Sequence, residues 1–467
     1  MHLLQELVRD PFQDLFERQR RHFRSGATRA YEWRMDQLDR MARLLSENEE
    51  TLHVAIRTDF KTASQEYLFE TYACLGEIMY QQSQLKDWMT PVEAPVPKAL
   101  AVTGHKAYIH REPHGVALII GPFNGPLLLV LRPAIAALAA GNSCILKLSP
   151  ALPATSALMA RLVDQYFEPC SVAAIVGGRE ETLELLRLPF HFIFFTGSTA
   201  VGKVVARAAA EHLTPVILQL GGQNPVVVDE TADIADAARK IVWGAMSWGG
   251  QWCSSPGYVC VHESVAEEFV AKSVAALVDL YGEDPKANPD YSRLISAGEV
   301  HRLAALLDME RVVIGGEIDP VERYFAPTIL YPAQWSDPIM QEEVFGPVLP
   351  ILIYKTFDEV LERISAKPSP LAAYIFTRNQ RAIDRFWSEL SFGGGPVNQV
   401  NIHLFIESMP FGGIGASGMG QYYGKHGFDA LTHPKSMLVS PPGVAIEHLL
   451  PPYTAAKNNE LTMWFDY

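Results

Sequence analysis

The chain has 467 residues, of which 48% are hydrophobic and 20% are charged, and its formal net charge is −14. This length and composition are typical of a globular protein with two or three domains and exclude a largely disordered chain. The acidic balance argues against a nucleic-acid partner, because binding to phosphates requires a basic face.

Cysteine and histidine usage bears on the compartment and on metal content. The five cysteines are odd in number and form no CxxC pair, and no histidines stand in the HExxH spacing of a zinc site. This usage favours a reducing compartment over a disulfide framework or a metal centre. We therefore predict a cytoplasmic protein that binds no metal.

Helices are expected over the first 90 residues. The stretch 31–60 carries apolar residues at helical spacing, and Ser46 with Glu49 fits a capping box. The proline-rich segment 91–104 is predicted to be a crossing or linker, and KAYIHREPHG (106–115) a strand that ends in a turn.

The most apolar stretch, residues 115–142, is too interrupted to span a membrane. It contains three prolines together with Asn124 and Arg132, whereas a spanning helix needs about 20 consecutive apolar residues. We predict a buried strand, a loop and a helix here, and we expect no membrane partner.

From residue 115 onward, short apolar strands alternate with helical segments. The expected strands of the first series are GVALII (115–120), SCILKLS (143–149), SVAAIVGG (171–178), FHFIFF (190–195) and TPVILQL (214–220). A second series begins near residue 232 and includes YVCVHE (258–263), VLPILIY (348–354) and LAAYIFT (371–377). This alternation predicts a doubly wound parallel sheet followed by a second α/β domain.

The stretch FFTGSTAVGKVV (194–205) runs from a strand through a glycine turn into a helix. Gly197, Gly202 and Lys203 fit the spacing G-x-x-x-x-G-K, but Val204 stands where a P-loop ATPase needs Ser or Thr for Mg²⁺. A glycine turn at a helix N-terminus still binds anions. Gly197, Ser198 and Gly202 therefore suit the diphosphate of a nicotinamide dinucleotide better than ATP, with a purely structural turn as the alternative.

Five motifs in order resemble the aldehyde dehydrogenase family. They are GPFNGP (121–126), LQLGGQNP (218–225), WGGQWCSSP (248–256), EEVFGP (342–347) and a tail, PFGGIGASGMGQYYGKHGFDALTHPKSML (410–438), that is similar to the class 3 branch. The resemblance covers about residues 23–439. It implies oxidation of an aldehyde to the carboxylic acid, with NAD or NADP as the cofactor.

The resemblance also implies an α/β architecture of three parts and a homodimer. A doubly wound, Rossmann-like dinucleotide-binding domain is expected over 1–92 and 114–219, and a catalytic α/β domain over 220–411. A small bridging element, 93–113 with 412–455, would pair two subunits by extending a sheet. Residues 456–467 form a C-terminal tail, too polar for a membrane anchor.

Two residues are assigned to acylation by the resemblance. A lone cysteine is more often a buried apolar residue, but GQWC marks Cys253 as the nucleophile, with Gly249 and Gly250 allowing close approach. Asn124 is the expected donor to the oxyanion, because an amide N–H stabilises the charge without proton transfer. Its backbone partner would be the N–H of Cys253.

The sequence departs from the family at the general base. The family carries Glu at the position of Gln219, and an amide cannot accept a proton at neutral pH; Gln223 likewise replaces the usual Lys. Glu343 could act as a surrogate base, the thioester could pass to coenzyme A or another thiol, or Gln219 could be an introduced Glu→Gln change. A catalytically weak relative with a binding role is the alternative from another class.

Cofactor contacts follow from the same motifs. Lys147 matches the lysine that binds the adenosine ribose, and Glu343 with Phe345 matches the pair that holds the nicotinamide ribose and ring. Leu220 and Gly221 are expected beside them. Pro150 stands where the family often has a Glu that opposes a 2′-phosphate, so NADP should be tolerated.

Aromatic residues beside the motifs suggest the substrate. Walls of this kind would suit an apolar or aromatic aldehyde, and ordinary core packing is the alternative. The candidate pocket residues are Phe123, Trp248, Trp252 and Phe405.

Overall fold

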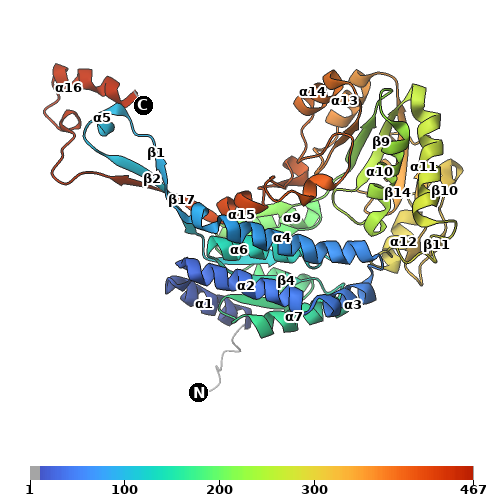
Figure 1. Ribbon diagram of the computed structural model, residues 1–467, viewed down its shortest axis with the longest axis horizontal. Coiled ribbons are helices and arrows are strands. Elements are labelled where there is room, and N and C mark those ends of the chain that lie inside the picture. Colours follow the sequence, from blue (N-terminus) through green and yellow to red (C-terminus); the bar gives the residue numbers. More distant parts are fainter. Residues whose placement is uncertain (1–10, 466–467) are drawn as a thin grey trace, which may run out of the picture.

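Helices begin the described part of the chain, as the sequence predicts, and residues 1–10 of that prediction lie outside it. The computed structural model describes residues 11–465, beginning with α1 (Pro11–Arg24), α2 (Tyr31–Glu47), α3 (Glu49–Asp59) and α4 (Ser64–Met89) (Figure 1). α2, α3 and α4 pack on one side of the first sheet, and α1 packs on the other. Ser46 lies inside α2, and α3 begins after Asn48 without a side-chain cap. The predicted capping box is therefore wrong. The residue at the N-cap of α3 is Asn48, two residues after Ser46.

The first sheet has the strand order β16-β7-β6-β3-β4-β5, and all neighbours except β16 and β7 run parallel. All five predicted strands of the first series are confirmed. They are β3 (Val116–Ile120), β4 (Ser143–Leu148), β5 (Val172–Val176), β6 (Phe192–Thr196) and β7 (Val216–Gln219), with β16 (Gly418–Met419) at the edge.

Helices cover both faces of this sheet, which makes it doubly wound. They are α6 (Leu128–Ala140), α7 (Pro153–Tyr166), α8 (Arg179–Leu185) and α9 (Thr199–Glu211). α6 ends at the C-cap Gly141, whose φ of 89° is left-handed. The chain reverses its direction of winding between β3 and β6, and the carboxyl ends of strands at such a switch point form a ligand crevice.

The second sheet has the order β10-β13-β14-β9-β8-β15 and is parallel except at β10. Its strands are β8 (Asn224–Val228), β9 (Pro256–His262), β10 (Val312–Ile314), β13 (Thr328–Leu330), β14 (Val348–Tyr354) and β15 (Tyr374–Phe376). Its helices include α10 (Ile234–Met246), α11 (Ala266–Tyr281), α12 (Ala297–Ala304), α13 (Phe357–Ser365) and α14 (Gln380–Glu389). The predicted second α/β unit is confirmed.

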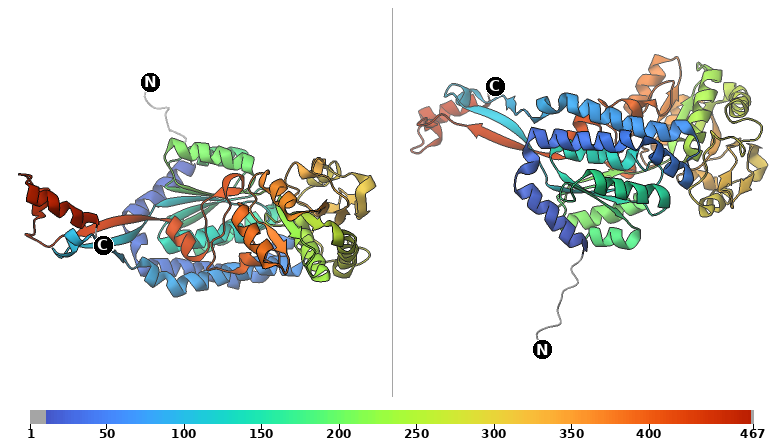
Figure 2. Two further views of the ribbon diagram at one scale, coloured as in Figure 1. Left: turned by 90° about the horizontal axis from the view of Figure 1, so that it is seen from above. Right: turned by 60° about the horizontal axis from the view of Figure 1, so that its bottom comes forward.

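A third, antiparallel sheet forms an arm that projects from one end of the body (Figures 1 and 2). It joins β1 (Val92–Ala94), β2 (Lys106–Pro113) and β17 (Thr432–Val439), and α16 (Ala455–Glu460) lies near its tip. Part of the predicted bridging segment lies elsewhere: β16 pairs with β7, and α15 (Gly424–Ala430) lies against the body. The other domain boundaries stay a prediction.

Two absences hold for residues 11–465. No helix in this range has the length and apolar character that crossing a bilayer would take. Nor does any group of three or more His, Cys, Asp or Glu side chains in the same range have an arrangement that could hold a metal ion.

Candidate active site

A cleft of about 860 Å³ lies at the carboxyl ends of β3, β6 and β7 and reaches the loops of the second sheet. This is the crevice that the topology predicts. The residues predicted from the motifs that line it are Phe123, Asn124, Lys147, Gly197, Ser198, Gln219, Leu220, Gly221, Cys253, Glu343 and Phe345. Segments more than 200 residues apart in the chain therefore meet in one site.

Four predicted residues do not line this cleft. Gly202 lies beneath Leu220, whose side chain a Cβ at Gly202 would meet at 2.6 Å, so this glycine permits packing. Trp248 and Trp252 stack at 4.6 Å between ring centroids, and Phe405 packs on the same cluster. The three aromatic side chains are thus turned toward the core, a direction that sequence proximity to a motif does not reveal.

The cofactor half of the cleft contains a buried cation. Lys147 is only 7% exposed, and its ammonium makes no hydrogen bond or ion pair within residues 11–465. Burial lowers the pKa of Lys147, and Glu181 opposes that shift. A buried, unpaired ammonium that faces a cleft needs an acceptor from a ligand, as a ribose hydroxyl or phosphate would supply.

The glycine turn beside it is built as an anion site. Ser198 caps α9 by accepting the N–H of Val201, and Gly197 precedes it at the cleft wall. The free N–H groups of the α9 N-terminus therefore border the cleft. Together with Lys147, these residues fit a dinucleotide cofactor.

Cys253 lies on the loop between η2 (Ser247–Gly250) and β9. Asn224 fixes this loop by donating to the carbonyl oxygens of Cys253 and Ser255 at 2.9 and 2.8 Å. Gly250 has a φ of 69° and faces the backbone of Gly346, where a Cβ would clash. Glycine is therefore required at position 250 for the nucleophile loop to approach the EEVFGP loop.

The thiol of Cys253 is protonated in this environment. Burial and then the neighbouring Glu343 carboxylate raise its pKa to about 12, while the backbone N–H groups of Cys253 and Ser254 oppose the shift. Since the thiolate is the nucleophile, the site needs a base to remove this proton. The two N–H groups that favour the thiolate are also donors available near the reacting sulfur.

Asn124 lies at the same loop as the nucleophile. Its side chain is 3% exposed, and Nδ2 donates to the carbonyl oxygen of Gln251 at 3.0 Å. Gln251 is itself held by Nε2 bonds to the carbonyls of Trp248 and Arg293. An amide carries two N–H groups, so the second remains for an oxyanion on a substrate attached to Cys253.

Replacing Asn124 by Ala is expected to slow the first turnover by about 10²–10³-fold, because one oxyanion donor is lost. The rate constant of the initial burst of reduced cofactor in rapid mixing measures this directly. An unchanged burst rate in Asn124→Ala would remove Asn124 from the chemistry.

The two candidate base positions differ in what they can do. Gln219 ends β7, is 1% exposed, and neither its Oε1 nor its Nε2 has a hydrogen-bond partner among residues 11–465. The carboxylate of Glu343 lies against Gly221, where a Cβ would clash. Burial raises the pKa of Glu343 to about 7, while the N–H of Gly222 and the Arg302 guanidinium oppose the shift. Glu343 is therefore poised to exchange protons at neutral pH.

Gln223 is held by hydrogen bonds within the protein. Its Nε2 donates to the carbonyl of Ile339 at 2.9 Å and its Oε1 accepts from Lys367 Nζ at 2.7 Å. A second bond reaches the carbonyl of Glu342. Gln223 thus ties the segment that precedes Glu343 to the sheet.

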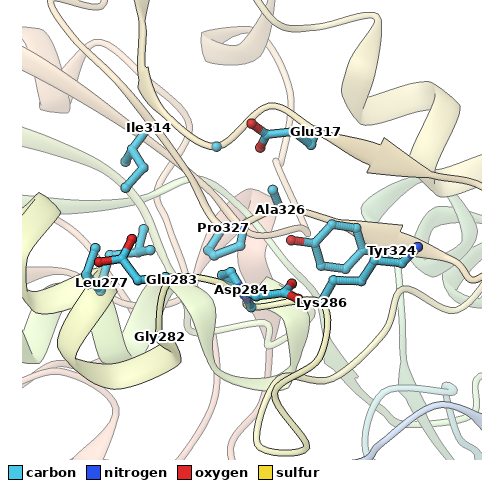
Figure 3. A pocket seen from close by; sticks show the side chains of 13 residues that line it. Leu277, Gly282, Glu283, Asp284, Lys286, Ile314, Glu317, Tyr324, Ala326 and Pro327 are labelled. Atoms are coloured by element: carbon cyan, nitrogen blue, oxygen red, sulfur yellow. The ribbon is translucent and has the colours of Figure 1, made fainter.

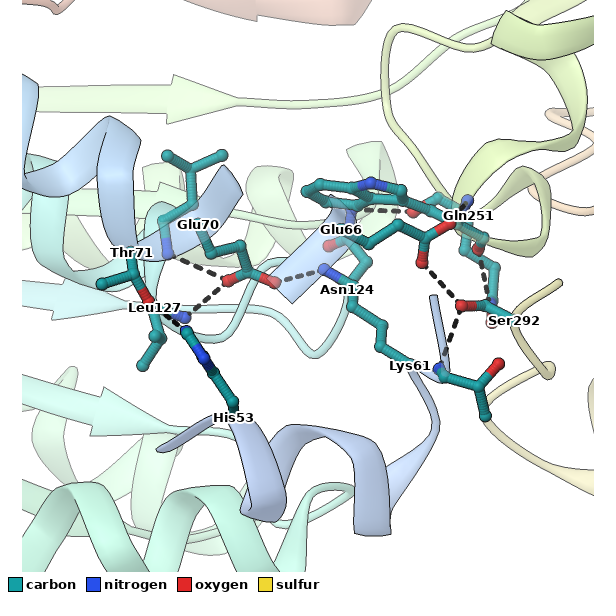
Figure 4. A network of polar contacts seen from close by, with 12 residues as sticks. His53, Lys61, Glu66, Glu70, Thr71, Asn124, Leu127, Gln251 and Ser292 are labelled. Atoms are coloured by element: carbon teal, nitrogen blue, oxygen red, sulfur yellow. Dashed lines mark hydrogen bonds and ion pairs between the residues drawn. The ribbon is translucent and has the colours of Figure 1, made fainter. Parts of the chain in front are cut away.

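Three residues that the sequence analysis did not single out stand behind the site. Lys61, Glu66 and Glu70 are buried (Figure 4). Glu66 accepts the backbone N–H of Trp248, Glu70 accepts that of Leu127, and Lys61 pairs with Glu70. The sequence feature that could have revealed them is the pair Glu66 and Glu70, two carboxylates four residues apart on the apolar face of a long helix.

A smaller cavity of about 420 Å³ lies between the end of α11 and residues 314–327 (Figure 3). Glu283, Asp284 and Glu317 border it, and Lys286 pairs there with Asp319 at 2.7 Å. None of the residues predicted from the motifs borders this cavity.

A doubly wound sheet with a cleft that fits a dinucleotide at its switch point is typical of cofactor-dependent oxidoreductases. A profile of the Aldehyde dehydrogenase family matches residues 8–437, and the chain belongs to this family. Its members oxidise aldehydes with NAD or NADP, and this chain is accordingly an NAD(P)-dependent aldehyde dehydrogenase.

Relatives and solved structures agree with that assignment. The chain is 41% identical to 4,4′-diaponeurosporen-aldehyde dehydrogenase of Staphylococcus aureus, over 92% of this chain and 94% of the relative. It is 40% identical to human aldehyde dehydrogenase family 3 member B1, over 93% of each chain.

Among solved structures, the substrate-bound Staphylococcus aureus AldH matches with a TM-score of 0.95 and 38% identity, over 98% of this chain and 100% of that one. Indole-3-acetaldehyde dehydrogenase AldA of P. syringae, solved in complex with NAD⁺, has a TM-score of 0.84 and 26% identity, over 92% and 89%. The resemblance to the class 3 branch is confirmed.

Proposed function

We propose that this protein oxidises an apolar or aromatic aldehyde to the carboxylic acid through an acyl-thioester on Cys253, with Glu343 as the base in place of Gln219. The observation that carries the proposal is the convergence of Cys253, Asn124 and Glu343 on one cleft. Of the two candidate positions, only Glu343 carries a group that can accept a proton.

The proposed mechanism begins with transfer of the thiol proton of Cys253 to Glu343. The thiolate attacks the aldehyde carbon, and the resulting thiohemiacetal oxyanion accepts hydrogen bonds from Asn124 Nδ2 and the N–H of Cys253. Lys147, the α9 N-terminus and Phe345 would hold the nicotinamide cofactor, which supplies the acceptor for the hydride that leaves the aldehyde carbon. Loss of that hydride leaves a thioester on Cys253.

Deacylation then depends on the same carboxylate. Glu343 sheds its first proton to solvent and takes one from the water that attacks the thioester carbonyl. Collapse of the tetrahedral intermediate releases the acid and returns the proton to the sulfur. A pKa of about 7 suits this double use, since the carboxylate can gain and lose a proton near neutral pH.

The walls near the thiol support an apolar substrate. Phe123 packs edge-on to Phe345 with 5.9 Å between ring centroids, and both line the cleft. The cations that line the cleft, Lys147 and Arg179, lie on β4 and α8 at the cofactor end. Trp248, Trp252 and Phe405 support the proposal only indirectly, as an apolar cluster that continues from the nucleophile loop.

The function is tested by rapid mixing of the protein with NADP, and separately NAD, and benzaldehyde, with and without coenzyme A. The proposal expects one reduced cofactor per site in a burst, followed by turnover without coenzyme A, and loss of both in Cys253→Ala. A stalled phase that coenzyme A releases would instead identify an acylating dehydrogenase. Absence of any burst across several aldehydes would identify a weak relative.

Cofactor choice is expected to respond to position 150. Pro150 lies beside Gly178 at the adenosine end, with its Cγ 3.9 Å from the Cβ position of Gly178. Pro150→Glu should weaken NADP binding by about tenfold or more, because a carboxylate would repel the 2′-phosphate, and change NAD binding little. Titrations of protein fluorescence without aldehyde measure both affinities, and Pro150→Gln is the uncharged control.

Two further features support proposals about the compartment and the oligomeric state. All five cysteines are free, which suits a reducing, cytoplasmic setting. The arm sheet exposes Met437, Leu438 and Val439 along β17, which suits pairing with a second copy in a homodimer.

A further inference from the structure

The buried face of α4 carries charged residues that reach both catalytic loops. Glu66 and Glu70 stand four residues apart on this helix, and Lys61 lies just before it. They are 6%, 0% and 0% exposed, respectively. Figure 4 shows the three side chains in one network with Asn124, Gln251 and Ser292. Charges buried so deeply cost free energy to desolvate, and apolar residues of similar size often give equal stability.

Glu66 holds the loop that bears the nucleophile. Its Oε1 accepts the backbone N–H of Trp248, and its Oε2 accepts the hydroxyl of Ser292 at 2.6 Å. Trp248 has a φ of 59°, a left-handed conformation that a bulky residue adopts only when its surroundings impose it. Cys253 follows five residues later, after Trp252, which stacks on Trp248.

Lys61 joins the two carboxylates. Its ammonium pairs with Glu70 and lies 3.3 Å from the ring centroid of Trp248, a close cation–π contact in a dry environment. The same ammonium is attracted to Glu66. Lys61 therefore holds the ring of Trp248, while Glu66 holds its backbone N–H.

Glu70 holds the loop that bears the oxyanion donor. Its Oε2 accepts the N–H groups of Leu127 at 2.8 Å and Leu128 at 3.1 Å. These N–H groups at the start of α6 have no acceptor within the helix, and the N-cap residue Leu127 provides no side-chain cap. Leu127, the N-cap of α6, lies three residues beyond Asn124, so Glu70 sets the position of the amide that faces the oxyanion.

We propose that Lys61, Glu66 and Glu70 are positioning residues for acylation, Glu66 acting through the Cys253 loop and Glu70 through Asn124. The inference rests on the proposed function, because it assigns two loops to one chemical step. Each carboxylate acts through a different catalytic group, whereas loss of general stability would affect both groups alike.

The test is a double-mutant cycle on the first-turnover rate with benzaldehyde and NADP. Glu70→Ala is expected to lower that rate by about tenfold or more in the parent, and by less than about twofold in Asn124→Ala. Glu66→Ala is expected to lower it about equally in both backgrounds. Glu66→Gln, which keeps an acceptor for the N–H of Trp248, is expected to recover most of the loss.

A second readout is independent of aldehyde chemistry. Alkylation of Cys253 by iodoacetamide, followed on the Cys253 peptide by mass spectrometry without cofactor, should slow by about tenfold in Glu66→Ala and stay within about twofold in Glu70→Ala. Failure of the proposed function would appear as no burst in the parent protein. Failure of the positioning inference would appear as equal alkylation rates in the parent and Glu66→Ala.

Asp229→Asn is the matched control for loss of a buried carboxylate. Asp229 is 4% exposed, accepts from Thr231 and Thr377, and follows the far end of β8 from Asn224. It should destabilise the fold without slowing the first turnover. Additive effects of Glu70→Ala and Asn124→Ala, or an equal loss in Asp229→Asn, would overturn the inference. Glu70→Gln carries the same cycle if the alanine variant does not fold.

Discussion

Replacing Gln219 by Glu is expected to raise steady-state aldehyde oxidation in the absence of a thiol acceptor by less than the ~10²–10⁴-fold contribution of a general base, because Glu343 already acts as one and the new carboxylate adds a second, provided that deacylation limits the rate. Gln219 lines the cleft, and neither of its polar atoms has a partner in the part of the chain that the structure describes, so a carboxylate there has room to accept a proton from water. Hydride transfer does not need this residue, and the amplitude of the first burst should stay at one per site.

The increase in steady-state rate of Gln219→Glu over the parent should appear at alkaline rather than acidic pH. Burial raises the pKa of Glu343 to about 7, and a second carboxylate in the same cleft would raise the pKa of at least one of the pair. Steady-state rates of Gln219→Glu should therefore rise with pH through and above neutrality. Gln219→Leu, which like the parent has no base at this position, is the control, and equal steady-state rates in Gln219→Glu and the parent would show that a carboxylate at position 219 adds nothing to Glu343.

Local patterns in the sequence predicted the fold well, because most strands of the two large sheets are short apolar runs bounded by turns. The alternation also indicated a parallel sheet, and the glycine turn at 197 marked the cleft. The edge strand β16 escaped prediction, because two residues that pair antiparallel with β7 have no periodicity of their own.

The site was predictable to the extent that its chemistry lies in contiguous motifs. Asn124, Cys253 and Glu343 each stand in a recognisable stretch, and the structure brings them together. The directions of Trp248 and Trp252 could not be predicted, since packing against α4 decides which way each ring turns. Glu66 and Glu70 were missed because their partners are more than 50 residues away in the chain.

Replacing Glu343 by Gln is expected to leave a burst and lower the steady state without coenzyme A by about 10²–10⁴-fold, because no carboxylate at either base position can then accept the proton of water. The first turnover should slow less than deacylation. Loss of this carboxylate removes a base for the thiol, but it also removes the negative charge that raises the pKa of Cys253.

The pH dependence has a definite sign. Deacylation in the parent should rise with pH through about 7, as Glu343 ionises, and this rise should vanish in Glu343→Gln. Because burial raises the pKa of Glu343 in the folded protein, its protonated form favours folding below the unfolded pKa, and that contribution is lost as pH rises through about 7. The Tm of Glu343→Gln minus the Tm of the parent should therefore be larger at about pH 8 than at about pH 5, two values that bracket the pKa.

Glu342→Gln is the control that distinguishes loss of the base from a change of charge in its loop. Glu342 precedes Glu343, is exposed, and pairs with Arg302 at 2.9 Å, so its loss changes the charge of the same loop without removing a group from the cleft. Full steady-state turnover of Glu343→Gln without a thiol acceptor would contradict the surrogate-base assignment. The double variant Gln219→Glu/Glu343→Gln then decides whether the two positions are interchangeable: recovered turnover would mean that the cleft needs one carboxylate at either place, and continued stalling would mean that Glu343 also orients the reacting groups.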